Sequence, residues 1–135
     1  MLILNVLAIS MLASMSIPVP TIVFGWIIWK FPPKKINRFY GYHTRMAMKT
    51  PETWKFAQEY FGKRLWKMGL GMTIPLIFQV LEWIIQHGSW SDLDFFFTSF
   101  FLLLGQILAL ILLIPLVEKA LKQNFNPDGT KKAGV

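Results

Sequence analysis

The first 29 residues, MLILNVLAISMLASMSIPVPTIVFGWIIW (residues 1–29), contain no ionisable side chain. About 20 apolar residues are enough for a helix to cross the roughly 30 Å hydrocarbon core of a bilayer. Two later stretches are similarly poor in charge: residues 68–86 contain only Glu82, and residues 95–117 contain no ionisable residue. The sequence therefore predicts an all-α integral membrane protein with three transmembrane helices, at about residues 2–29, 67–87 and 94–118.

The positions of the basic residues predict the orientation of these helices. All 14 Lys and Arg lie within residues 30–67 and 119–132. Residues 30–67 hold ten of them and two acidic residues, whereas residues 87–94 hold two Asp and neither Lys nor Arg. Basic loops stay on the cytoplasmic side of a membrane. We therefore predict a cytoplasmic loop at 30–66, an external N-terminus and a cytoplasmic C-terminus.

The composition also argues against several classes of function. A net charge of +7 is typical of nucleic-acid binding in a soluble protein. Here the charges flank predicted spans, where they bind anionic lipids of the inner leaflet, so we expect no nucleic-acid partner. The chain has no Cys, and its two histidines, His43 and His87, are predicted to lie on opposite sides of the membrane. With no recognised catalytic motif either, we expect neither enzymatic activity, nor a metal, nor a cofactor.

The organisation of the chain is that of one membrane domain. We predict a single three-span unit at residues 1–125 and a disordered basic tail at 126–135, where Pro, Gly and Lys are frequent. Within the cytoplasmic loop, Thr50, Pro51 and Glu52 are typical of a helix start, and Gly62 is typical of a helix end. Trp54, Ala57 and Phe61 share one face of the intervening helix. This pattern predicts a short amphipathic interfacial helix at about residues 51–61.

Proline and glycine interrupt the predicted spans. Pro18 and Pro20 each remove a backbone hydrogen bond, which predicts a kink in the first span. A kinked helix exposes carbonyl groups that lipid cannot satisfy, so this region should face protein or water. The alternative is that the uncharged run, about 42 Å long at 1.5 Å per residue, simply breaks to fit the bilayer. Gly69, Gly71 and Gly105 are expected to allow close packing of neighbouring helices.

Polar residues gather on one face of the second span. Gln79 and Gln86 lie three residues before and four residues after Glu82. Together with Gln106 of the third span they are candidates for an intramembrane polar face that lines a cavity. Two interpretations of Glu82 stay open. A carboxylate within a span is a candidate functional group, yet Glu82 lies near the predicted outer end, where its side chain can reach the interface.

The loop between the first two spans contains the most specific motif. Residues 37–49 read NRFYGYHTRMAMK, and Trp54 and Ala57 follow in the next helix. This arrangement resembles the signature of the SdpI family of small bacterial membrane proteins, which reads Asn, Gly-Tyr-Arg-Thr, Ser-Met-Lys, then Trp and Ala. His43 and Ala47 replace the family's Arg and Ser. The residues that form this region are candidates for binding an anion or a partner: Asn37, Arg38, Gly41, Tyr42, His43, Thr44, Arg45, Met48, Lys49 and Trp54.

The resemblance implies a role in toxin immunity. The namesake of the family protects its producer from a secreted membrane-active peptide toxin and holds a transcriptional repressor at the membrane. By this resemblance we expect a multi-pass protein of the bacterial plasma membrane that gives toxin resistance. Its partners would be a peptide toxin outside and, for signal transduction, a cytoplasmic regulator.

A second functional class rests on the residues of the loop. Arg38, Tyr42, His43, Thr44, Arg45 and Lys49 supply hydrogen-bond donors that suit phosphate oxygens. They would form an inner-leaflet site that binds, transports or processes a phospholipid or polyprenyl phosphate. A third interpretation is that these residues only anchor the loop to the bilayer. The sequence leaves the choice open, as it does the oligomeric state.

Overall fold

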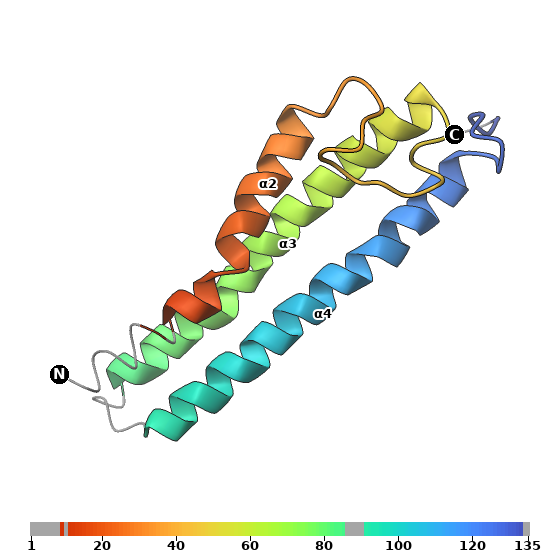
Figure 1. Cartoon of the computed structure of the whole chain (residues 1–135). Coiled ribbons are helices and arrows are strands. Elements are labelled where there is room, and N and C mark those ends of the chain that lie inside the picture. The colour runs from red at the N-terminus through yellow and green to blue at the C-terminus, as the bar shows by residue number, and fades with distance from the viewer. Residues whose placement is uncertain (1–8, 10, 86–90, 134–135) are drawn as a thin grey trace.

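The computed structural model describes residues 9, 11–85 and 91–133. Its three long helices are α2 (Pro18–Lys30), α3 (Pro51–Ile85) and α4 (Asp92–Asn124), and they form an elongated bundle (Figure 1). Within the described residues the chain is all-α, as predicted. Two helical segments, Met11–Lys30 and Phe96–Asn124, are long and apolar enough to cross a membrane. The remaining predicted span, 67–87, falls on the second half of α3, which ends at Ile85.

Helix α3 corrects the prediction of a separate interfacial helix. Its start is as predicted, because Thr50 Oγ1 accepts a hydrogen bond from Thr53 N at 3.2 Å and Thr53 Oγ1 accepts one from Thr50 N at 3.0 Å. The helix then continues through Gly62 for 35 residues, about 50 Å at 1.5 Å per residue. Gly62 lies against the backbone of Ile28 and Trp29, so it serves helix packing and does not end the helix.

Close packing between α2 and α3 depends on one of the predicted glycines and on others that were not predicted. Gly69 packs as expected, since a Cβ there would lie 2.8 Å from Ile22 N. Gly25, which the sequence analysis did not single out, is pressed against the backbone of α3. Among the described residues, nothing lies within 4 Å of a Cβ position at Gly71 or Gly105, so the expectation of close packing is wrong for both.

The predicted break in the first span is present. Helical turns at residues 11–15 stop at a turn at 16–17, and α2 then begins at Pro18 (Figure 1). Pro18 is fully buried, and it borders a recess whose other wall is residues 73–81 of α3. The Ser14 carbonyl, to which Pro18 cannot donate, instead accepts a hydrogen bond from Gln106 Nε2 at 3.2 Å, so this carbonyl faces protein, as expected. Pro20, in contrast, is exposed.

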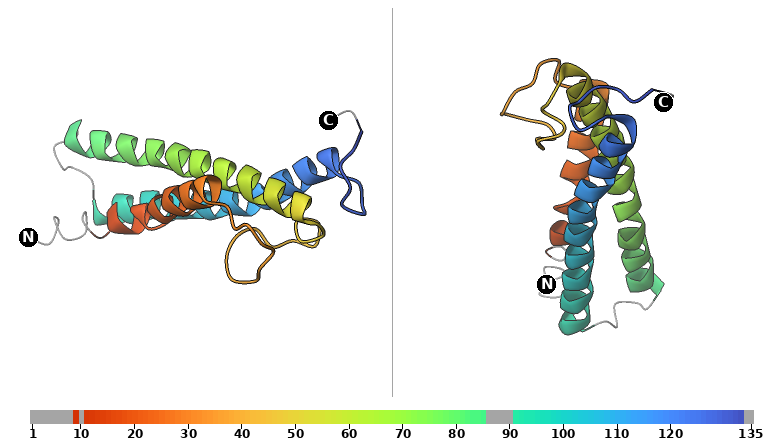
Figure 2. Two further views of the ribbon diagram at one scale, coloured as in Figure 1. Left: turned by 90° about the horizontal axis from the view of Figure 1, so that it is seen from above. Right: turned by 90° about the vertical axis from the view of Figure 1, so that its right-hand side faces the viewer.

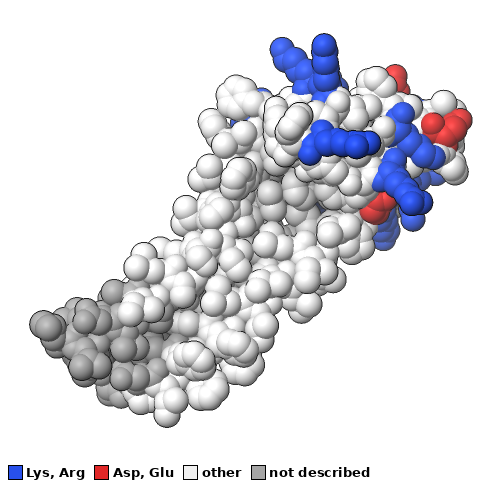
Figure 3. Space-filling model, in the orientation of Figure 1, with Lys and Arg blue, Asp and Glu red and all other residues white. Residues whose placement is uncertain are grey.

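The Lys and Arg side chains gather at one end of the bundle, which we call the basic end (Figure 3). The end of α2, the start of α3 and the end of α4 meet there, and the loop 31–50 projects to one side (Figure 2). The predicted disordered tail is instead folded in its described part, residues 126–133. Asn126 N donates to Thr130 O at 2.8 Å, and Gly129, with a φ of +92°, closes the turn. Burial of Phe125 explains the difference, because it returns the chain to the bundle.

Candidate binding site at the basic end

The motif loop (residues 37–49) is fixed to α3 by one buried amide side chain. Gln58 Oε1 accepts a hydrogen bond from Tyr42 N at 2.7 Å, and Gln58 Nε2 donates to Tyr42 O at 2.9 Å. Gln58 is completely buried, so both bonds form away from water. Gly41 precedes this contact with a φ of +111° and lies directly against the Gln58 side chain. The positive φ and the close contact give the reason for glycine at this position.

The side chain of Tyr42 joins the motif loop to α4. Its hydroxyl lies 3.1 Å from Glu118 Oε1 and 3.2 Å from Ile114 O, two acceptors that share its single proton. The ring packs against Phe61 of α3 at a centroid distance of 5.1 Å, and 5 % of the residue is exposed. Burial, followed by the charge of Glu118 and the hydrogen bond to it, raises the pKa of Tyr42 above its usual value. Tyr42 therefore contacts both α3 and α4.

Two contacts of Trp54 and two turns within the loop complete the structure around the motif loop. Trp54 is buried, and its Nε1 donates to Pro33 O at 2.7 Å. The exposed ring of His43 packs on Trp54 at 5.6 Å. Asn37 Oδ1 accepts hydrogen bonds from Phe39 N at 3.0 Å and from Tyr40 N at 3.2 Å. Thr44 Oγ1 accepts a hydrogen bond from Ala47 N at 3.3 Å, and Ala47 is fully buried.

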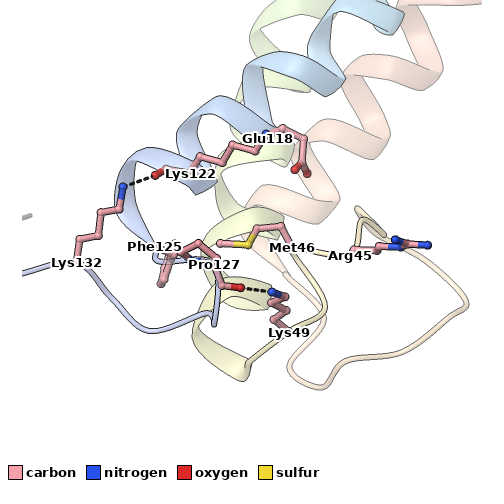
Figure 4. Close-up of a pocket in the computed structure, with 8 residues that line it drawn as sticks. All are labelled: Arg45, Met46, Lys49, Glu118, Lys122, Phe125, Pro127 and Lys132. Atoms are coloured by element: carbon pink, nitrogen blue, oxygen red, sulfur yellow. Dashed lines mark hydrogen bonds between the residues drawn. The ribbon is translucent and has the colours of Figure 1, made fainter.

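A pocket of about 450 Å³ lies between the motif loop, the end of α4 and residues 126–133, which we call the C-terminal turn (Figure 4). We call it the cationic pocket, because four of its eight lining side chains are basic and one is acidic. Lys49 Nζ donates to Pro127 O, and Lys132 Nζ donates to Lys122 O at 2.7 Å. The lining residues are Arg45, Met46, Lys49, Glu118, Lys122, Phe125, Pro127 and Lys132.

The predicted motif residues thus lie in different environments. Of the six donors expected to form one anion site, only Arg45 and Lys49 line the cationic pocket. Residues 41–44 instead border a second recess of about 350 Å³, which is walled mainly by apolar side chains of α3 and α4. Arg38 is exposed on the projecting loop, and Met48 is half-buried. The expected single cluster is therefore divided in the structure.

The predicted intramembrane polar face is divided as well. Gln79 Nε2 lies 3.4 Å from Ser99 Oγ, whereas Gln106 Nε2 donates to Ser14 O at 3.2 Å. Gln106 also lines a recess of about 430 Å³ between α3 and α4, to which Gln79 does not contribute. The side chain of Glu82 and the whole of Gln86 lie outside the described residues.

Sequence reasoning missed the partners of the motif. It did not single out Gln58, which the structure buries. Position 118 entered only as the end of the predicted third span, and Lys122 and Lys132 only as members of the second basic segment, residues 119–132. One sequence feature could have indicated the burial of Gln58. Gln58 directly follows Ala57, which was predicted to lie on the apolar face of the helix and is buried in the structure. The contacts of Glu118, 76 residues from Tyr42, left no local pattern to read.

The apolar helices and the single basic end define a membrane protein with a structured polar cap on one side. Comparison with known proteins then identifies its family. Residues 34–118, more than half of the chain, match the SdpI/YfhL protein family, so the chain belongs to that family. It is 32 % identical over 116 residues to a Bacillus subtilis (strain 168) protein named "Uncharacterized protein YfhL", covering 84 % of this chain and 89 % of that one. No solved structure matches the chain.

Proposed function

We propose that this protein crosses the bacterial plasma membrane three times, with the N-terminus outside and the basic end in the cytoplasm. The observation that carries this topology is the collection of the described Lys and Arg at one end of the bundle (Figure 3). Positive loops stay on the cytoplasmic side. At about 50 Å, α3 is longer than a hydrocarbon core of roughly 30 Å, so its charged first turns would stand in the cytoplasm.

The topology can be tested by labelling because the natural chain has no Cys. Single cysteines replace Leu93 near the start of α4 and Phe39 on the projecting loop, which are 65 % and 95 % exposed. A membrane-impermeant maleimide should label Leu93→Cys in intact cells and Phe39→Cys only after permeabilisation. The reverse order of labelling would contradict the proposal.

Within this topology, we propose immunity to a secreted membrane-active peptide toxin, with signalling through a cytoplasmic regulator. Membership of the SdpI/YfhL family supports the role. The motif loop supports the signalling, because Gln58 and Glu118 connect it to α3 and α4, whose other ends would face the toxin. Coupling requires that the toxin binds one packing of these helices better than another. Both parts of the role are binding functions without a covalent step.

Survival of toxin-treated cells tests the immunity function. Expression of the wild-type chain in sensitive bacteria should raise the toxin concentration that kills them. Phe39→Ser removes an apolar side chain that is 95 % exposed and should leave protection unchanged while it weakens capture of a cytoplasmic regulator. Wild-type expression without any protection would remove immunity from consideration.

A second candidate function is the binding of an anionic lipid at the inner leaflet. The excess of cationic side chains around one pocket at the basic end favours it. Basic pockets beside membrane helices on the cytoplasmic side bind lipid head groups. Gentle extraction followed by native mass spectrometry should find an anionic lipid on the wild-type protein; a protein free of lipid would count against this function.

A further inference from the structure

We propose that the cationic pocket is a binding site for a phosphate-bearing group, with the C-terminal turn as one of its walls. This inference deepens the second proposed function and rests on it. It differs from the sequence-based hypothesis in the residues that it assigns. Only Arg45 and Lys49 come from the motif loop, while Lys122 belongs to α4 and Lys132 to the tail.

The charge of the pocket favours an anion. Its four cations outnumber its one carboxylate, which leaves a net lining charge of +3 (four minus one). Glu118 is also engaged, because it accepts the Tyr42 hydroxyl at 3.1 Å. Outside the lining, hydrogen bonds from Thr130 and, to a smaller extent, the charge of Lys49 lower the pKa of Asp128. The Asp128 carboxylate accepts two hydrogen bonds from Thr130, and an excess of positive charge remains.

Hydrogen bonds hold two of the cations in place. Lys49 Nζ is bonded to Pro127 O and Lys132 Nζ to Lys122 O (Figure 4). An ammonium group has three donors, so each lysine keeps two for a ligand. The C-terminal turn is held from its other side as well, because Thr50 Oγ1 donates to Gly129 O at 3.3 Å. The pocket is thus formed before a ligand arrives, which lowers the cost of binding.

The remaining walls suit the apolar part of a lipid better than bulk water. Met46, Phe125 and Pro127 supply them, and Phe125 is buried. Arg45 lies at the rim, with its guanidinium directed away from the lysines (Figure 4). Its side chain must turn toward the pocket before the planar guanidinium can form paired hydrogen bonds to the same phosphate group as the lysines. The ligand chemistry is therefore a phosphate group, carried by a lipid or free in the cytoplasm.

The test compares two double variants of the full chain in detergent. Arg45→Gln with Lys122→Gln removes two pocket charges, and neither side chain forms a hydrogen bond within the described part of the chain, so the turn stays tied. Lys34→Gln with Lys35→Gln removes two exposed charges outside the pocket and serves as the matched control. Lys132→Gln is a further variant that also releases the Lys122 carbonyl. Circular dichroism checks the fold of each.

Titration with phosphatidylglycerol, followed by native mass spectrometry, measures the first binding event. The pocket variant should bind roughly 30-fold more weakly than wild type, and the control should change by less than about threefold. Saturable binding of inorganic phosphate, seen by phosphorus NMR and lost in the pocket variant, without preference for phosphatidylglycerol over phosphatidylcholine would assign the same pocket to free phosphate.

Three results would overturn the pocket. Equal weakening in the control and the pocket variant would mean that charge attracts the lipid without a defined site. Unchanged binding in the pocket variant would show that the lipid does not bind in the pocket. Anionic-lipid binding would then take place elsewhere on the basic end. A wild-type protein that binds neither phosphatidylglycerol nor phosphate would end both the inference and the function on which it rests.

Discussion

Replacement of Gln58 by Met should release the motif loop from α3. Met is close to Gln in volume, so packing changes little, but it offers neither the acceptor nor the donor that Tyr42 N and Tyr42 O now use at 2.7 and 2.9 Å. Each buried backbone group left without a partner costs about 1–3 kcal/mol. The two together destabilise the closed loop by about 2–6 kcal/mol, so the loop should open more readily in the variant.

Hydrogen exchange followed by mass spectrometry measures this opening directly. A loss of about 2 kcal/mol or more should speed exchange of the Tyr42 amide by roughly 30-fold or more. Gln123→Met makes the same chemical change at an exposed position of α4 and should have no measurable effect. Exchange at Tyr42 within about threefold of wild type would show that the Gln58 bonds do not hold the loop, and the reasoning would fail.

Three further predictions concern stability. Tyr42→Phe removes the hydroxyl that donates a hydrogen bond to Glu118. Because folding raises the pKa of Tyr42, the contribution of this hydroxyl to the stability of the folded state is complete below about pH 10 and falls as the pH rises. Thermal unfolding between pH 8 and 12 should therefore show a steeper loss for wild type than for the variant. Gly62→Ala should cost about 1–3 kcal/mol by overlap with the α2 backbone, whereas Gly71→Ala, which faces open space, should be neutral or stabilising in a denaturant titration. Thr50→Ala should cost about 1 kcal/mol in the same titration through loss of the helix cap.

Features set by neighbouring residues were predictable from the sequence. Thr50 and Pro51 marked the start of α3 because capping depends on residues within one turn. The break before Pro18 likewise follows from the missing N–H of proline. Gly62 misled the analysis, since glycine both ends helices and allows another backbone to approach, and only the position of α2 decides between the two roles.

Features set by distant residues were not predictable. Gln58 looked like a surface residue because an amide is polar, and its burial becomes favourable only when the Tyr42 backbone supplies both partners. The cationic pocket has the same character. Lys132 joins Lys122 of α4 at the pocket because the chain turns back after the buried Phe125, and no periodicity in the sequence reports that turn.

The motif loop is best understood as a connection between two helices. Gln58 belongs to α3 and Glu118 to α4, and Tyr42 bonds to both, through its backbone and its hydroxyl. A change in the spacing of α3 and α4 would therefore strain one of these contacts. Glu118 also lines the cationic pocket, so an anion bound there would act on the same carboxylate that accepts the Tyr42 hydroxyl. Ligand binding in the pocket and helix packing are thus expected to influence each other, and by linkage the influence is reciprocal.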